Sequence, residues 1–239
     1  MGLGNYIGGE IALSYSTDTL FYCSAGVAIL SVLTILGMKE TLTSTEKFSW
    51  KLLKIKKEDI YEPTVIIPSV VMMLVTFSFG AALTLAPDLS EHLGINNKGL
   101  FFSYFTMTSL VSRVVGGRLS DEFGRRKVLI AAMLIVGTGS VYIGSSSSSF
   151  HLLTGALIFG AGYGLSSPAL FAWAADLAPD EFRGRGFSTI FMALEIGIGT
   201  GALLAGQIYN NNPDNFFTVF AGCGGLAFLA FVYLMFKGK

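Results

Sequence analysis

The most informative shortage in this 239-residue chain is charge. Asp, Glu, Lys and Arg make up 13% of the residues, whereas soluble domains carry about 25%. Hydrophobic residues make up 52%, which is more than a soluble protein of this length can hide from water but is what a lipid bilayer accepts. The formal net charge is zero, so the charge balance indicates no nucleic-acid partner.

Cysteine and histidine are also scarce, which argues against a metal centre and against catalysis. Cys23 and Cys223 lie in apolar runs without any CxxC or Cys/His spacing. His92 and His151 fall at the ends of apolar segments and have no spacing that would pair them on one helix. An intramembrane enzyme would need a paired nucleophile and base, or metal ligands at helical spacing. We therefore expect no catalytic residue, no metal and no cofactor.

Long apolar segments predict a helical protein that crosses the membrane many times. Seven of eight have about the twenty residues that a helix needs to cross ~30 Å of hydrocarbon, and the first is too short. The eight segments span residues 2–16, 18–38, 64–88, 98–116, 128–146, 150–174, 186–208 and 215–236. The alternating runs of ~10 residues that are typical of membrane β-barrels are absent. We predict an all-α bundle with about eight transmembrane segments.

The distribution of Lys and Arg predicts an orientation. If residues 39–62 are cytoplasmic, fifteen of the sixteen Lys and Arg residues fall on that side, and Lys98 is the exception. Membrane proteins carry such an excess of positive charge in short cytoplasmic loops. We therefore expect an integral protein of the cytoplasmic (inner) membrane with both chain ends on the cytoplasmic side.

A charged motif at residues 117–127, between two apolar segments, carries the most specific signal. It reads Gly-Arg-Leu-Ser-Asp-Glu-Phe-Gly-Arg-Arg-Lys. The motif resembles the loop signature that joins the second and third helices of a six-helix half in the major facilitator superfamily of secondary transporters. One position departs from the family pattern, because Glu122 stands where a basic residue is usual. The resemblance implies alternating access by two helix bundles, with the lipid bilayer and a small-molecule substrate as partners.

The resemblance also implies that the motif latches the inner gate while the transporter faces outward. From the residues themselves, Gly117 allows close helix approach, Gly124 permits a tight turn, and Asp121 can cap a helix N-terminus or meet a positive end dipole. The planar donors of an arginine suit a carboxylate such as Asp176, at the inner end of the sixth segment. A simpler alternative is that these charges only enforce topology. The predicted gating residues are Gly117, Asp121, Gly124, Arg125, Arg126 and Asp176.

An internal repeat predicts how the chain is divided. Gly2, Gly4, Gly9 and Ile11 match Gly199, Gly201, Gly206 and Ile208 with one offset of 197 residues. Because the superfamily is built from parallel six-helix repeats, residues 64–239 are expected to form a complete C-terminal half. Residues 1–38 would then be the last helices of an N-terminal half whose preceding helices, needed for a full cavity, are missing. Residues 39–63 would be a cytoplasmic linker, in which the Lys-rich stretch 47–57 is either an amphipathic helix on the inner leaflet or solvated.

Glycines four residues apart predict close helix contacts. Gly4 and Gly8 form one such pair, and Gly197 and Gly201 form another. Both pairs fit either static packing or sliding between the two halves during transport. Residues 4–9 also resemble the glycine-rich core in the fifth helix of proton-coupled drug exporters, with Asn5 in place of the usual proline.

Three residues are the candidates for the substrate and proton pathway. Glu195 lies near the middle of its segment, where an acid is costly unless it is protonated, faces a cavity or binds a neighbouring helix. Arg113 is expected one turn from the inner surface, either snorkelling to water or facing an acidic group in the cavity. Tyr163 lies near Pro168, and proline-interrupted helices often border the cavity of a transporter.

These features favour a secondary active transporter of small organic molecules, with proton-coupled efflux as the first interpretation. The alternatives are uptake of a sugar or other metabolite by the same kind of transporter, and a truncated fragment that transports nothing. Exporters and importers share the signature motif, and selectivity depends on cavity side chains. The sequence therefore identifies neither the substrate nor the direction of transport.

Overall fold

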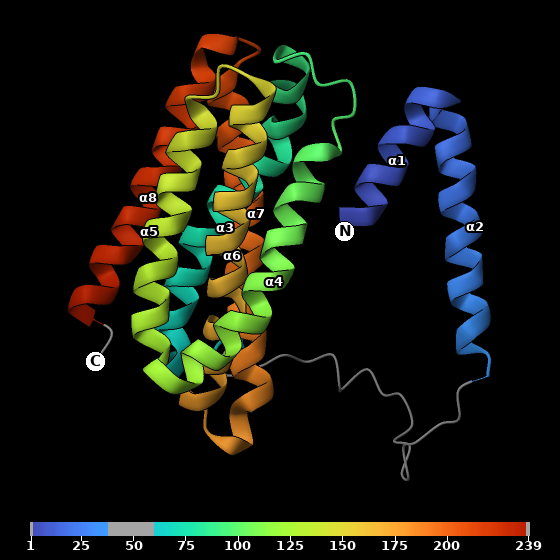
Figure 1. Ribbon diagram of the computed structural model, residues 1–239. Coiled ribbons are helices and arrows are strands. Elements are labelled where there is room, and N and C mark those ends of the chain that lie inside the picture. Colours follow the sequence, from blue (N-terminus) through green and yellow to red (C-terminus); the bar gives the residue numbers. More distant parts are fainter. Residues whose placement is uncertain (1, 38–59, 238–239) are drawn as a thin grey trace.

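The computed structural model describes residues 2–37 and 60–237, and within these ranges all regular structure is helical (Figure 1). The long helices are α1 (Gly2–Ser14), α2 (Thr17–Ile35), α3 (Ile66–His92), α4 (Leu100–Phe123), α5 (Arg125–Gly144), α6 (Ser149–Leu177), α7 (Arg183–Tyr209) and α8 (Phe216–Lys237). Single turns of 3-10 helix, η3 (Pro63–Val65), η4 (Asp180–Phe182) and η5 (Pro213–Asn215), precede α3, α7 and α8. The predicted all-α fold is confirmed. The Lys-rich stretch 47–57 lies outside the described residues.

Short polar side chains set where several helices begin and end. The hydroxyl oxygens of Ser16 and Ser148 cap α2 and α6. They accept hydrogen bonds of 3.2 Å from the backbone N–H groups of Thr19 and His151. Asn210 ends α7 in the left-handed conformation, with φ of 46°. The run of five serines at residues 145–149 therefore supplies the N-cap of α6.

Helices α3 to α8 form one bundle in which α3 is the most enclosed helix (Figure 1). α3 packs against α7 and α8, α6 packs against α4 and α5, and α5 also packs against α8. On α3, Val71, Met72 and Leu85 are at most 1% exposed. In Figure 1, α5 and α8 lie on the side of the bundle away from α1, and α4 lies on the side toward it.

Glycines let α7 approach α3 closely. A Cβ atom added at Gly201 would lie 2.8 Å from the carbonyl carbon of Phe77, and one at Gly197 would lie 2.5 Å from the carbonyl oxygen of Met73. Both distances are shorter than van der Waals contact, so a larger residue at either position would push the helices apart. This is the geometry that the second glycine pair predicts.

The close contact predicted at the first glycine pair is not seen. No described atom lies within 4 Å of a Cβ added at Gly4, and one at Gly8 would make an ordinary contact with Leu20 at 3.4 Å. The reason is that α1 turns a different face toward the bundle. On that face Gly9 lies against the side chain of Asn97, in the connection between α3 and α4.

Helices α1 and α2 lie beside the bundle. α1 contacts α4, and the Nδ2 of Asn97 donates a hydrogen bond of 2.8 Å to Oε1 of Glu10 on α1. α2 has no buried residue among those described and stands apart in Figure 1. The assignment of residues 1–38 to the end of another half stays a prediction.

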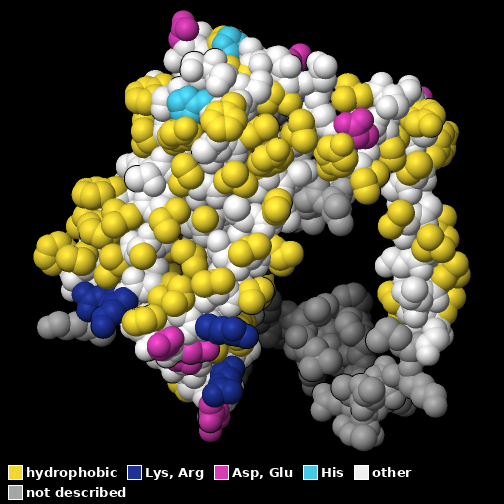
Figure 2. Space-filling model, in the orientation of Figure 1, with side chains coloured by type: hydrophobic (Ala, Val, Ile, Leu, Met, Phe, Trp, Pro, Cys, Tyr) yellow, Lys and Arg dark blue, Asp and Glu magenta, His cyan; other side chains and the backbone are white. Residues whose placement is uncertain are grey.

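Six helical segments of the described chain are long and apolar enough to cross a membrane. They are Thr17–Ile35, Pro63–His92, Arg125–Gly144, Ser149–Leu177, Asp180–Tyr209 and Pro213–Lys237. The sequence predicts seven segments of sufficient length, and α4 is the one that is not among these six. With 24 residues α4 is long enough to cross a membrane, but its hydroxyl groups and charges make it less apolar than the other helices. α1, with 13 residues, is short, as predicted. The visible face has an apolar middle, and its Lys and Arg side chains gather toward the lower end (Figure 2).

Candidate functional site

Most of the charged motif is helical. α4 continues to Phe123 and α5 begins at Arg125, so within the motif Gly124 is the one residue outside a helix. Gly124 has φ of 90°, a conformation that glycine adopts readily and other residues avoid. The expectation that α4 stops near residue 116 is wrong, because charged side chains at a helix end can reach water without breaking the helix. We call the end of the bundle that carries residues 117–127 the motif end.

Arg125 joins the ends of α4, α5 and α6. Its Nε donates a hydrogen bond of 3.0 Å to Oδ2 of Asp176, at the end of α6. Its Nη1 donates to a carboxylate oxygen of Asp121 and, at 3.1 Å, to the hydroxyl of Ser120. Ser120 is 1% exposed, so the guanidinium is anchored on the inside of the bundle as well as at its surface. Three of the predicted gating residues thus form one cluster.

Two other expectations for the motif need correction. Asp121 caps no helix, because its carboxylate pairs with Arg125 and no side chain caps α5. No described atom lies within 4 Å of a Cβ added at Gly117. The adjacent Gly116 makes the close contact instead, with a Cβ position 3.2 Å from the Cα of Leu165 on α6.

Arg126 binds a different helix from those that Arg125 binds. Its Nε and Nη2 donate hydrogen bonds of 2.8 and 2.7 Å to the carbonyl oxygens of Leu234 and Met235, in the last turn of α8. These carbonyls have no partner within their own helix, and the negative end of the helix dipole favours a cation there. Arg126 therefore fastens the end of α8 to the start of α5.

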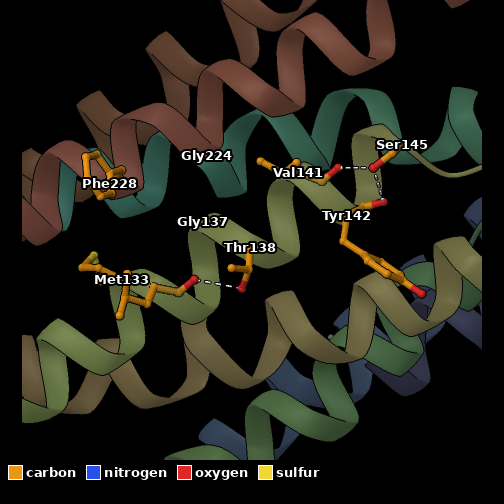
Figure 3. A pocket seen from close by; sticks show the side chains of 9 residues that line it. Met133, Gly137, Thr138, Val141, Tyr142, Ser145, Gly224 and Phe228 are labelled. Atoms are coloured by element: carbon orange, nitrogen blue, oxygen red, sulfur yellow. Dashed lines mark hydrogen bonds between the residues drawn. The ribbon is translucent and has the colours of Figure 1, made fainter.

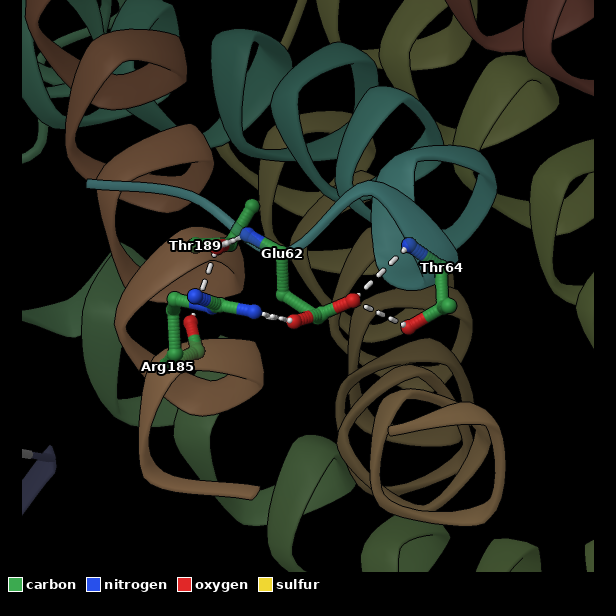
Figure 4. A network of polar contacts seen from close by, with 4 residues as sticks. All are labelled: Glu62, Thr64, Arg185 and Thr189. Atoms are coloured by element: carbon green, nitrogen blue, oxygen red, sulfur yellow. Dashed lines mark hydrogen bonds and ion pairs between the residues drawn. The ribbon is translucent and has the colours of Figure 1, made fainter. Parts of the chain in front are cut away.

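No sequence pattern indicates the second ion pair at the motif end (Figure 4). The Nη2 and Nε of Arg185, on α7, donate hydrogen bonds of 2.6 and 3.0 Å to Oε2 of Glu62. The hydroxyl of Thr64 donates to the other carboxylate oxygen at 3.0 Å, and the Glu62 N–H donates to the hydroxyl of Thr189 at 2.8 Å. Glu62 is 3% exposed. The hydrogen bond from Arg185 holds the pKa of the Glu62 carboxyl below its ordinary value.

All three residues predicted for the substrate and proton pathway line one cavity of about 440 Å³. The cavity is bordered by α3, α4, α6 and α7, and Arg113, Tyr163 and Glu195 come from the last three of these helices. Tyr163 is 8% exposed, whereas the other two side chains are exposed. We call this space the central cavity. Its geometry suits a pathway, and the roles of the three residues stay predictions.

Arg113 lies further from the end of its helix than the apolar segment alone suggests. Because α4 continues to Phe123, Arg113 is ten residues, or ~15 Å, from the motif end of α4. The two alternatives for its side chain, snorkelling to water and facing an acidic group in the cavity, stay predictions.

Aromatic rings form an apolar wall of the central cavity. The rings of Phe79 and Phe105 flank Tyr163, with centroids 4.8 and 5.6 Å from its ring. The hydroxyl-bearing residues Thr106 and Ser109 line the same space. A cavity with an apolar wall and a few polar groups is typical of sites for small molecules.

A second hollow, between α5 and α8, has a different character (Figure 3). No charged residue lines it, and Gly137 and Gly224 form its floor where the two helices approach. The hydroxyls of Thr138 and Ser145 donate hydrogen bonds to carbonyls of their own helix, α5. With these two hydroxyls occupied and a lining that is otherwise apolar apart from Tyr142, the hollow offers few groups to a polar substrate.

Comparison with known proteins gives a consistent result. The sequence profile of the Major Facilitator Superfamily matches residues 68–239. Myo-inositol transporter 2 of Schizosaccharomyces pombe is 34% identical over 106 residues, which cover 44% of this chain and 19% of that protein. The human proton myo-inositol cotransporter is 29% identical over 139 residues, which cover 58% of this chain and 29% of that protein. The chain thus spans less than a third of the length of these two relatives.

A solved structure supports the same fold. The peptide transporter POT, a mutant in complex with sulfate, superposes with a TM-score of 0.64 at 19% identity. The superposition covers 76% of this chain and 41% of the transporter chain. At this level of identity, the likeness shows the fold alone.

Proposed function

This chain belongs to the Major Facilitator Superfamily, and from this premise we propose that it is part of a secondary transporter that takes up a sugar, a polyol or a similar hydroxylated molecule. The observation that carries the proposal is the central cavity, which is lined by an aromatic wall and by a few polar and charged groups from four helices. Two relatives named as inositol transporters support the substrate class. The family and the fold are those of transporters and not of enzymes.

Uptake replaces efflux as the favoured direction. The two relatives described above are named as inositol transporters, and one of them is named a cotransporter of protons. The exporter-like core of residues 4–9 gains no support from these relatives. Proton coupling, if this chain shares it, would use Glu195, because Glu195 is the carboxylate in the lining of the central cavity.

The motif end would act as the inner gate. The cluster of Arg125, Asp121 and Asp176 ties α4, α5 and α6 together within this bundle. In the proposed cycle this bundle rocks against another, and the cluster keeps the ends of its own helices aligned when the inner side is closed. The partner bundle would come from residues beyond those that match the family profile.

Transport in proteoliposomes tests the proposal. The complete transporter of which this chain is proposed to be a part would be purified, reconstituted and supplied with radiolabelled myo-inositol and D-xylose, with and without an inward proton gradient. Saturable counterflow of either compound supports the proposal. Accumulation above equilibrium under the gradient supports proton coupling. If neither compound shows counterflow or competes for binding in nanodiscs, the proposed substrate class is wrong.

A further inference from the structure

Two charged residues line the central cavity, and within the described chain neither Arg113 nor Glu195 makes a hydrogen bond or an ion pair. Arg125, Arg126 and Arg185, at the motif end, instead bind protein oxygens. The side chain of Arg113 is exposed on the cavity wall, and no protein oxygen among the described residues uses its donors. The guanidinium is therefore available to bind an anion.

The two charges lie at similar depth on different helices. Arg113 is ~15 Å from the motif end of α4, and Glu195 is twelve residues, or ~18 Å, from the motif end of α7. Their charged atoms are not within the 4.0 Å of an ion pair, although both line the same space. The cavity thus presents a positive group and a negative group with room between them.

We propose, building on the transporter function above, that the substrate is a hydroxylated carboxylate of the sugar-acid type. Its carboxylate binds Arg113, whose planar guanidinium matches a carboxylate with two parallel hydrogen bonds. Its hydroxyls donate to Glu195, which accepts hydrogen bonds when ionised. The charge of Glu195 repels the substrate carboxylate, so the two ends of the molecule cannot exchange places.

The rest of the cavity fits the same ligand. The C–H face of a sugar ring is apolar and can lie against the aromatic wall of Phe79, Phe105 and Tyr163. A volume of about 440 Å³ is within the ~300–1,000 Å³ of sites for small ligands. A neutral sugar would fill the same space but would lack the charge-assisted hydrogen bonds that a carboxylate forms with the guanidinium of Arg113.

Binding to the 239-residue chain in nanodiscs tests the inference. Saturation-transfer NMR would compare D-glucuronate with D-glucose at pH 7, because this method detects weak binding. We expect D-glucuronate to bind on the order of tenfold more tightly, as a charge-assisted hydrogen bond allows. Arg113→Gln should remove this preference, so that D-glucuronate binds no more tightly than D-glucose. Arg113→Lys should keep part of it, because the charge remains without the planar fork.

A control substitution separates the site from a general effect of charge. Arg183→Gln also removes one cation, but Arg183 is an exposed residue that pairs with Asp180 outside the cavity. This variant should retain the full preference for D-glucuronate. Each variant would first be shown to elute as a single monodisperse species, so that a loss of binding is not a loss of folding.

The outcomes distinguish this inference from the proposed function. If both compounds bind equally and Arg113→Gln changes neither, the substrate is a neutral sugar, and the inference fails while the proposed function stands. If L-phenylalanine binds more tightly than D-glucuronate, the two charges recognise a zwitterion and the inference fails. If no sugar, sugar acid or amino acid binds to the folded chain, both the inference and the proposed function are wrong.

Discussion

Arg185 and Glu62 are 123 positions apart in the chain, yet the guanidinium of one donates two hydrogen bonds, of 2.6 and 3.0 Å, to a single carboxylate oxygen of the other. The guanidinium also lies over the ring of Phe182, 4.1 Å from its centroid. Since Glu62 precedes η3 and Arg185 is in the first turn of α7, the pair fixes the starts of α3 and α7 to each other. These two helices also border the central cavity, so the pair holds two of its walls together.

We expect Glu62→Gln to lower the melting temperature at pH 7, because the substitution removes a charged partner from Arg185. The ion pair depresses the pKa of Glu62 below its ordinary value of 4.5. Its stabilisation is therefore fully present above that value and is lost as the pH falls through the lower pKa of the folded state. The difference between parent and variant should be largest at pH 7 and should shrink below about pH 4.5.

Fluorescence-detected thermal melting in detergent would measure this difference. Glu91→Gln is the matched control, because Glu91 also pairs with a cation, Lys98, but both side chains are largely exposed. The control should melt like the parent. A Glu62→Gln variant with the melting temperature of the parent at pH 7 would show that the pair contributes nothing to stability.

The second prediction concerns the Arg125 cluster. Asp176→Asn should change the melting temperature by no more than ~4 °C, because exposed ion pairs contribute roughly 0.2–1 kcal/mol. Transport should slow much more than this suggests, because the amide cannot hold the guanidinium that ties α6 to the ends of α4 and α5. Counterflow rates in proteoliposomes, normalised to the amount inserted, would measure the effect. Parent-like rates would leave the motif only a role in topology.

The third prediction concerns close packing of α3 and α7. A Cβ at Gly201 would lie 2.8 Å from the carbonyl carbon of Phe77, so Gly201→Ala should destabilise the fold by about 1–3 kcal/mol through overpacking. Gly199→Ala is the control on the same helix, because no described atom lies within 4 Å of its Cβ position. The control should be neutral or slightly stabilising, since alanine favours a helix. Equal melting temperatures for both variants would contradict the contact.

Much of the fold can be predicted from patterns in the sequence, but some contacts between particular residues cannot. Apolar length predicts the helices, because crossing hydrocarbon leaves few alternatives. The contact between Arg125 and Asp176 could be predicted, because residues 117–127 resemble a family motif and that resemblance implies the contact. No pattern links Glu62 to Arg185, because a contact across 123 positions depends on how α3 and α7 pack.

Two further differences between prediction and structure come from helix rotation and from helix length. Gly116 makes the contact expected of Gly117, because one residue along a helix turns the side chain by ~100° and only packing decides which face is inside. α4 ends at Phe123 and not near residue 116, because the helix runs on through polar residues. A short charged stretch at a helix end looks the same in sequence whether it is a loop or a final turn.

The last prediction concerns coupling. Glu195 is the carboxylate that lines the central cavity, and the other titratable residues of the lining are Arg113 from α4 and Tyr163 from α6. α3 contributes only the apolar Phe79 to this lining. Replacing the acid by glutamine keeps its shape and its capacity for hydrogen bonds but removes titration. We expect Glu195→Gln to keep counterflow exchange and to lose the accumulation that an inward proton gradient drives.

Paired assays in proteoliposomes distinguish this result from general damage. Counterflow needs binding and alternating access but no net proton movement, so a variant that has lost only coupling retains it. Glu181→Gln is the control, because Glu181 is an exposed residue of η4 at the motif end, outside the cavity lining. It should keep both activities. If Glu195→Gln accumulates substrate with the pH dependence of the parent, Glu195 is a ligand for substrate hydroxyls alone. The protonated group must then lie outside the lining of the central cavity, because that lining holds no other carboxylate and no histidine.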